Sequence, residues 1–254
     1  MFAAVILIGA ALLMLPISAQ ERTVTPFHEA LFTATSAVCV TGLVVRDTAS
    51  HWSAFGQAVL MVLIQIGGLG VMTLLALVSM AMGRRIGLRQ RTILQESVAS
   101  FSVGGIVRLI RLALIGTAVI EGLGAAALAF RFVPMLGWAK GIWYGVFHSI
   151  SAFCNAGFDI LGTSANPFPS LTGYSANVLV NVVIMLLIII GGIGFLTWDD
   201  IYRNKMNFKR YRMQSKIILM TTVCLIVFPA FFFFACDLKN LPAGERLLAA
   251  MFQS

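Results

Sequence analysis

Several stretches of this chain are too long and too apolar to lie at the surface of a water-soluble protein. Residues 53–83 include no charged side chain, which is ample for a helix that crosses the roughly 30 Å hydrocarbon layer at a tilt. Hydrophobic residues make up 59% of the 254 positions and charged residues only 11%, too little polar surface to coat a soluble globule. The expected fold class is an all-α integral membrane protein.

A pattern of eleven residues recurs beside these apolar stretches. It reads F-x3-S-A-x-C-x2-G and occurs as FTATSAVCVTG at residues 32–42 and as FHSISAFCNAG at residues 147–157, an offset of 115 residues. About ten helical residues rise only about 15 Å, half the depth of the hydrocarbon layer. A helix that goes half-way into the membrane and ends at a glycine predicts a re-entrant pore loop.

The order of apolar runs and pore loops predicts tandem units, each with an outer helix (M1), a pore helix and a second helix (M2). Phe252 aligns with Phe32 and Phe147, the first residues of the recurring pattern. The alternative for residues 1–19 is a cleaved signal peptide, which would lack the usual basic beginning. The first predicted unit is 1–83, with an M1 truncated at its start, and it is followed by a cytoplasmic linker at 84–107 that includes a short amphipathic helix at 88–100. The second predicted unit is 108–202, with its M2 at 176–198. Residues 203–254 are predicted to hold a third M1 and the start of a third pore helix.

The basic residues indicate the orientation of the chain. The formal net charge is +8, and two inter-helix segments hold twelve of the 18 lysines and arginines. By the positive-inside rule, both segments face the cytoplasm. Nucleic acid is not an expected partner, because the basic residues are neither spread over a soluble face nor interleaved with aromatic residues. The twelve residues are Arg84, Arg85, Arg89, Arg91, Arg108, Arg111, Arg203, Lys205, Lys209, Arg210, Arg212 and Lys216.

The chemistry of the two loops is expected to come from the backbone. A cation entering the membrane must exchange hydration oxygens for protein oxygens, and carbonyls directed at a common axis supply them without charged side chains. Irregular backbone at membrane depth is tolerated where it is buried or lines a wet cavity. The C-terminal ends of the pore helices would favour cations over anions. The candidate ion-binding carbonyls are those of Val40, Thr41, Gly42, Asn155, Ala156 and Gly157.

Each predicted M2 helix has a pair of glycines in its middle. Gly67 and Gly68 lie in the segment IGGLG, and Gly191 and Gly192 lie in IGGIG. Small residues allow helices in a membrane to approach closely, and glycines can also let a helix bend. Close packing and a hinge below the loop are therefore both open as roles for these glycines.

Three polar residues are further candidates. Glu121 lies ten residues from both Arg111 and Arg131, hence near mid-membrane, and a hydrogen bond to a neighbouring helix is favoured over ion or proton coupling. His148 lies in the second pore helix, where packing or a capping bond is favoured over ligand binding. Asp159 follows the second loop at the expected pore mouth, either to concentrate cations or as an ordinary solvated charge.

The four cysteines include no C-x2-C pair or Cys/His cluster that would predict a metal site. Small buried thiols are favoured over disulfides. We therefore expect no covalently bound cofactor and no metal beyond a transported ion.

The segments TSAVCVTGLVV, IQIGGLGVMTLL and FHSISAFCNAGFDILG resemble the potassium-translocating, KtrB-like subunits of the Trk/Ktr/HKT superfamily, over essentially the whole chain. The resemblance implies four M1-pore-M2 repeats around a pseudo-fourfold pore. It also implies potassium uptake across the cytoplasmic membrane, sodium-dependent in several members, through a filter to which the six carbonyls contribute. A homodimer seated on a cytosolic nucleotide-binding regulatory ring (RCK-type, KtrA-like) is implied as well. With two complete loops and the start of a third, the chain is expected to be a fragment.

Two other classes of function are open. An intramembrane hydrolase could use Ser36 or Ser151 with His28 or His148, but the serines recur with the pattern while the histidines do not, unlike a unique catalytic dyad. An enzyme is therefore not expected. The main alternative to a transporter is a non-conducting accessory or scaffold membrane subunit with degenerate repeats.

Overall fold

The computed structural model describes residues 2–70, 106–163, 165–205, 207–237 and 242–254. These residues form helices and loops, and no β-strand longer than an isolated bridge occurs among them. The predicted amphipathic helix at 88–100, the inner half of the first M2 and the arginines between positions 84 and 91 lie outside the described residues.

The first unit consists of α1 (Phe2–Met14), α2 (Phe27–Val38), the short α3 (Thr48–His51) and α4 (Ala54–Leu69). The helix α2, which the sequence predicts as the first pore helix, buries Ala30, Ala34 and Ala37, which share one face at helical spacing. Small side chains on this face let α1 and α4 both pack closely against α2. The Ser53 hydroxyl accepts a hydrogen bond from the Gly56 N–H at 3.2 Å and so caps the start of α4.

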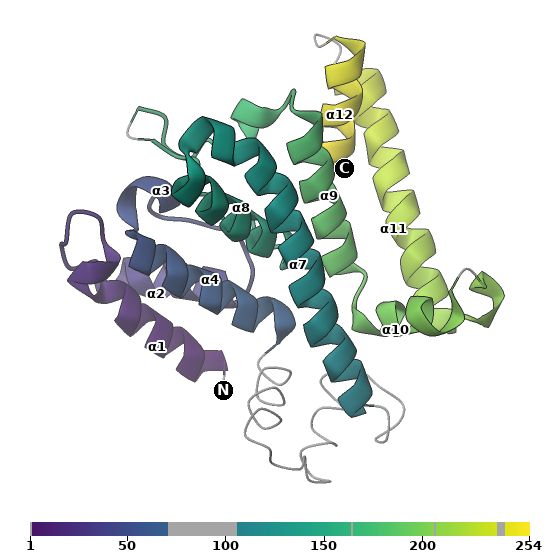
Figure 1. Ribbon diagram of the computed structural model, residues 1–254, viewed down its shortest axis with the longest axis horizontal. Coiled ribbons are helices and arrows are strands. Elements are labelled where there is room, and N and C mark those ends of the chain that lie inside the picture. Colours follow the sequence, from purple (N-terminus) through teal and green to yellow (C-terminus); the bar gives the residue numbers. More distant parts are fainter. Residues whose placement is uncertain (1, 71–105, 164, 206, 238–241) are drawn as a thin grey trace.

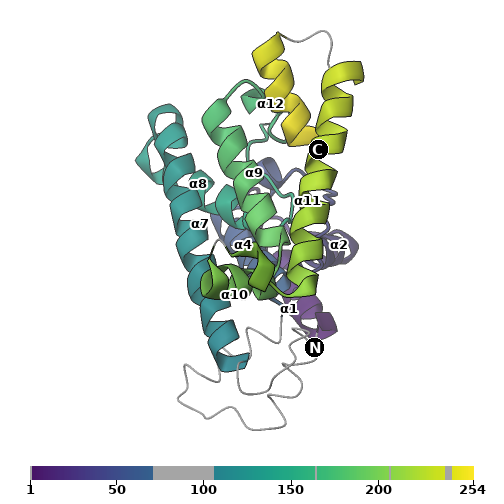
Figure 2. The ribbon, with the colours of Figure 1, turned by 90° about the vertical axis from the view of Figure 1, so that its right-hand side faces the viewer.

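The second unit is built around α7 (Ile106–Leu136), α8 (Trp138–Phe153) and α9 (Val178–Gly192). Gly137, with φ of +83°, makes the turn from α7 into α8. The helix α8, predicted as the second pore helix, then packs along α7, with Gly145 against the backbone of Ala125 and Ala129. Figure 1 shows α7 in teal between the group of α1, α2 and α4 and the green α9, and Figure 2 shows α9 on the side away from that group.

Two helices in the described part of the chain are long and apolar enough to cross a membrane, Leu109–Leu136 and Met213–Asp237. The second of these comprises α11 (Met213–Phe232) and a turn of π-helix at Phe233–Asp237. After it, α12 (Ala243–Gln253) contains Phe252, the residue that the sequence aligns with Phe32 and Phe147, and it packs against α11 and α9. The protein is an all-α membrane protein.

The predicted continuous M2 at 176–198 is wrong beyond Gly192. There α9 ends, and α10 (Phe195–Asn204) continues at an angle of 95°. Gly194 lies between the two helices with φ of +81°, a left-handed conformation that favours glycine. The three glycines of the segment GGIG are poor helix formers, so the apolar run can turn here instead of continuing straight. Figure 2 shows α10 lying across the foot of α9.

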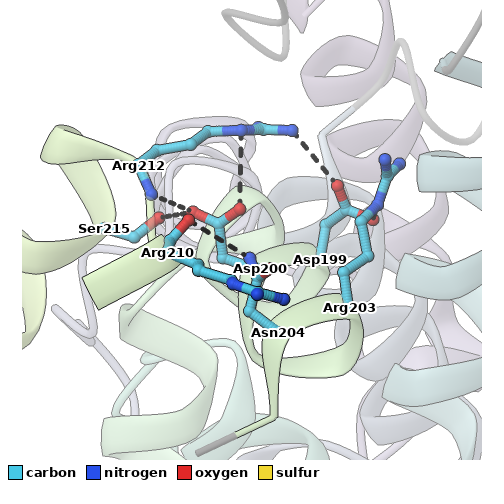
Figure 3. Close-up of polar contacts among 7 residues, drawn as sticks. All are labelled: Asp199, Asp200, Arg203, Asn204, Arg210, Arg212 and Ser215. Atoms are coloured by element: carbon cyan, nitrogen blue, oxygen red, sulfur yellow. Dashed lines mark hydrogen bonds and ion pairs between the residues drawn. The ribbon is translucent and has the colours of Figure 1, made fainter. Parts of the chain in front are cut away.

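A polar cluster, here called the inner clasp, joins α10 to the start of α11 (Figure 3). The Asp200 carboxylate accepts hydrogen bonds from the Ser215 hydroxyl at 2.5 Å and from the Arg212 backbone N–H at 3.1 Å. The Arg212 guanidinium also lies 3.3 Å from the Asp199 carboxylate. Both aspartates are buried, and Asp200 satisfies backbone and side-chain donors in the first turn of α11. The clasp therefore ties the bent M2 to the next M1 within the predicted cytoplasmic segment.

All four cysteines are free, as expected. The prediction that they are buried holds for Cys154 and is wrong for Cys39, Cys224 and Cys236, which are exposed. Cys224 lies on α11, a helix that buries little of its surface in this chain and is apolar enough to face hydrocarbon.

Candidate functional site

The loops that follow the two pore helices have the same backbone conformation. Each helix is followed by a cysteine in the right-handed region, with φ of −86° at Cys39 and −75° at Cys154. The next residue is left-handed in both loops, with φ of +56° at Val40 and at Asn155. For a β-branched residue such as Val40 this conformation is strained, and strain of this kind persists only where the surroundings enforce it.

The third residues along the two loops are Gly42 and Gly157, with φ of +76° and +72°. The intervening residues Thr41 and Ala156 differ in exposure, the first being exposed and the second buried. A left-handed residue and, two positions later, a left-handed glycine thus recur 115 residues apart, although Val40 and Thr41 in the first loop are replaced by Asn155 and Ala156 in the second. The recurring sequence pattern therefore encodes a recurring loop shape.

The serine of the recurring pattern holds each loop against its helix. The Thr41 N–H donates to the Ser36 carbonyl at 3.0 Å, and the Ala156 N–H donates to the Ser151 carbonyl at 2.8 Å. The hydroxyls add a second tie: Thr41 donates to the Ser36 hydroxyl at 2.9 Å, and Ser151 donates to the Phe158 carbonyl at 2.6 Å. This role was missed in the sequence, although the recurrence of the serine with the glycine was its signal.

His148 bonds to backbone and not to a serine. Its Nδ1 lies 2.7 Å from the Tyr144 carbonyl, and its Nε2 accepts from the Ile160 N–H at 3.5 Å. With Nδ1 as the donor and Nε2 as the acceptor, the buried ring is neutral and ties the segment after the second loop to α8. Of the two predicted roles, packing agrees with the burial of the ring, whereas neither bond caps the end of a helix; the hydrolase arrangement of His148 with Ser151 is not formed.

The structure brings the two loops into contact through their glycines. A Cβ atom placed on Gly42 would lie 2.7 Å from the Ala156 carbonyl oxygen and 3.5 Å from the Cα of Gly157. A Cβ on Gly157 would in turn lie 3.5 Å from the Cα of Gly42. Two loops that are distant in sequence thus meet backbone to backbone, with no side chain between their glycines.

The glycine pairs of the M2 helices lie directly behind the loops. A Cβ on Gly67 would overlap the carbonyl of Val38, the last residue of α2, and one on Gly191 would overlap the carbonyl of Phe153, the last residue of α8. A Cβ on Gly68 would lie 2.5 Å from Cys154 Sγ. At Gly192 the nearest atom, Asn155 Nδ2, would be 3.6 Å away, an ordinary contact. Three of the four glycines therefore sit where a side chain would displace a pore helix or its cap.

Asp159 is half-buried beside a cavity of about 290 Å³. One of its carboxylate oxygens accepts a hydrogen bond from the Leu161 N–H at 3.3 Å. Its neighbours around the cavity include Ser151, Asn155, Gly157 and Phe252, the last from α12. The cavity thus lies between the second loop and the helix that the sequence aligns with the two pore helices.

Glu121 makes the predicted hydrogen bond to a neighbouring helix. Its carboxylate oxygen Oε2 lies 2.9 Å from Gln65 Nε2 on α4, so the bond joins the first unit to the second. The described residues contain no cluster of three or more His, Cys, Asp or Glu side chains suited to a metal ion.

This chain is similar to known cation transport proteins. A family model described as "TrkH: Cation transport protein" matches residues 2–235. The potassium/sodium uptake protein NtpJ of Enterococcus hirae is 42% identical over 226 residues, which cover 89% of this chain and 49% of that protein. The Ktr system potassium uptake protein B of Bacillus subtilis is 40% identical over 255 residues, and that of Vibrio alginolyticus 38% over 261; the matches cover 98% and 100% of this chain and 55% of each relative. The chain spans about half the length of the curated relatives it matches.

Proposed function

Because this chain belongs to the TrkH family of cation transport proteins, we propose that it supplies two of the filter loops of a potassium uptake protein. The observation that carries the proposal is the contact of Gly42 with Gly157 between two loops of the same backbone shape. Potassium would be the transported substrate, and no bound cofactor is needed for the passage of an ion through such a filter.

The proposed filter uses the carbonyls of Val40, Thr41 and Gly42 from the first loop and of Asn155, Ala156 and Gly157 from the second. Both loops follow the C-terminal end of a pore helix, where the helix dipole favours a cation. Left-handed residues turn successive peptide groups in a way that a regular helix or strand cannot. Asp159 is proposed to attract cations toward the second loop from the pore mouth.

Close packing supports a structural role for Gly67, Gly68 and Gly191, which we propose fix the depth of the pore helices. Gly192 has room for a small side chain and lies next to the 95° bend between α9 and α10. Of the four glycines, it is the one for which a hinge role is proposed. Movement there would change the position of α9 behind Asn155.

We propose that the protein acts in the cytoplasmic membrane, with the inner clasp on the cytoplasmic side. The relatives from Bacillus subtilis and Vibrio alginolyticus are named as parts of a Ktr system, which implies further subunits in those organisms. A homodimer on a cytosolic nucleotide-binding ring, and a dependence of transport on sodium, are the corresponding proposals for this chain.

Uptake of rubidium, a congener of potassium, tests the proposal. The full reading frame that encodes these residues would be expressed in bacteria that lack their own potassium uptake. We expect growth at limiting potassium and rubidium uptake that exceeds the empty vector at least tenfold, with sodium added and omitted in parallel. Rubidium uptake equal to that of the empty vector would show that the protein is not a potassium transporter and would favour a non-conducting subunit.

A further inference from the structure

Glu121 is a buried carboxyl group in the middle of a helix that faces the membrane. It lies ten residues from Arg111 and from Arg131, and only 9% of its surface is exposed. The ion pairs found in the described part of the chain do not include it. A group of this kind is costly to keep within the hydrocarbon layer, so its contacts should account for its presence.

Three elements meet at Glu121. From α4, Gln65 Nε2 donates to Glu121 Oε2 at 2.9 Å. From α8, the Ser149 hydroxyl donates to the Glu121 backbone carbonyl at 2.7 Å. At the end of α8, the Cys154 thiol lies 3.9 Å from Glu121 Oε1 and 3.6 Å from Gln65 Oε1. The carboxyl group therefore contacts the M2 of the first unit and the pore helix of the second at once.

The contact between Glu121 and Cys154 matters for the second loop because of where Cys154 lies. Cys154 is the residue immediately before Asn155, Ala156 and Gly157, and it caps the C-terminal end of α8. Its sulfur also lies close to Gly68 of α4, where an added Cβ atom would be 2.5 Å away. The equivalent residue of the first loop, Cys39, is exposed. Glu121 thus acts on one of the two loops only.

We propose that Glu121 is a positioning residue for the second filter loop. Through Gln65 and the Cys154 thiol it would fix where that loop begins, and so set how well the site discriminates potassium from sodium. This inference rests on the proposed function, since discrimination has a meaning only if the loops conduct. Beyond the proposed function, it assigns control of selectivity to a side chain that lies outside both loops and acts by hydrogen bonding.

Two substitutions at Glu121 separate hydrogen bonding from mere volume. Glu121→Gln keeps the size and one carbonyl oxygen that can accept from Gln65, whereas Glu121→Leu keeps the volume and removes both oxygens. Thr117→Val is the matched control: Thr117 lies one turn earlier on α7, is also buried, and its hydroxyl has no partner in the described part of the chain. Thermal unfolding of each purified protein shows that it is folded.

The first readout is competition of sodium against rubidium uptake by the full reading frame in cells. We expect Glu121→Leu to lower the discrimination at least fivefold, and Glu121→Gln and Thr117→Val to stay within twofold of the unsubstituted protein. Discrimination within twofold for Glu121→Leu would overturn the proposal. An equal loss of discrimination in Glu121→Gln and Glu121→Leu would also overturn the proposal. Glutamine can still accept the hydrogen bond from Gln65, so an equal loss would mean that this bond does not set the discrimination.

The second readout does not depend on transport. In a background in which every cysteine of the reading frame except Cys154 is replaced by serine, among them the exposed Cys39, Cys224 and Cys236, a membrane-permeant maleimide can label only Cys154. We expect Glu121→Leu to raise the labelling rate at least fivefold and Thr117→Val to leave it unchanged. An unchanged rate in Glu121→Leu would overturn the positioning role even in cells that show transport. An absence of rubidium uptake with a raised labelling rate would instead refute the proposed function and leave the contact intact.

Discussion

Gly42 and Gly157 lie against one another across the candidate site, and a Cβ atom added to either would be 3.5 Å from the Cα of the other. The contact is not symmetric. A Cβ atom on Gly42 would also lie 2.7 Å from the Ala156 carbonyl oxygen, whereas the atom nearest to a Cβ on Gly157 would be the Gly42 Cα at 3.5 Å. The two glycines are therefore predicted to respond differently to the same substitution.

Substitution by alanine tests this asymmetry. Both residues are left-handed, which costs an L-residue roughly 1–2 kcal/mol, but Gly42→Ala also pushes on a carbonyl of the second loop. We expect Gly42→Ala to lower the discrimination of rubidium from sodium about tenfold or more in cellular uptake, and Gly157→Ala to lower it less. Gly137→Ala is the control, because Gly137 has a similar φ of +83° with no atom within 4 Å of the added Cβ. If the control loses as much selectivity as Gly42→Ala, backbone strain and not loop contact is responsible.

Alanine at Gly191 tests the packing of M2 behind its pore helix. The added methyl would overlap the Phe153 carbonyl, and overpacking of this kind costs about 1–3 kcal/mol. We expect a lower melting temperature of the purified protein in detergent. Gly122→Ala, in open space on α7, should leave the melting temperature unchanged or raise it, since alanine is the better helix former by up to about 1 kcal/mol. A normal melting temperature with altered transport in Gly191→Ala would point to a hinge instead.

Removal of the Asp200 carboxylate tests the inner clasp. Asp200→Ala leaves the buried Ser215 hydroxyl and the partly buried Arg212 N–H without their acceptor, a loss of about 1–3 kcal/mol. We expect a clear fall in the melting temperature. Arg203→Gln is the comparison, because Arg203 pairs with Asp199 from a side chain that is 42% exposed and such pairs contribute about 0–1 kcal/mol. Equal effects of the two substitutions would contradict the assignment of the clasp to Asp200.

The ion pair at the outer end of α2 predicts a dependence of stability on pH. Arg46 donates two hydrogen bonds of 2.9 Å to Glu29, and the hydrogen bond and charge of its guanidinium lower the pKa of Glu29 below the usual value. Because this folded-state pKa is lowered, the stabilisation is fully present above the unfolded pKa of about 4.3 and is lost as the pH falls through the folded pKa.

The measurement is the difference in melting temperature between the unsubstituted protein and Arg46→Gln. We expect a positive difference at pH 7 that disappears near pH 3. Arg22→Gln, at an exposed arginine of the same outer region, should show no pH-dependent difference. A difference that persists unchanged to pH 3 would show that Arg46 stabilises by packing and not through Glu29.

Features that depend on residues close together in the sequence could be predicted, whereas contacts between distant segments could not. The all-α membrane class comes from hydrophobic length, and the recurrence of the pattern at Phe252 indicated the helix α12 that contains this residue. A bend at the glycines of M2 was left open, but the 95° turn after Gly192 could not be derived, because the apolar run continues through it and hydrophobicity does not report backbone direction. The inner clasp was also missed, since Asp200 and Ser215 are brought together only by the turn between α10 and α11.

By itself the sequence determined that two short helices end in loops of the same kind, since a serine and a glycine six residues apart recur at an offset of 115 residues and encode a local conformation. Only the tertiary structure decided that Gly42 meets Gly157, that Gly67 and Gly191 lie behind their own pore helices, and that Glu121 reaches Cys154. Contacts between distant segments depend on how the helices pack, and packing is set by the shapes of many side chains at once and not by any one motif.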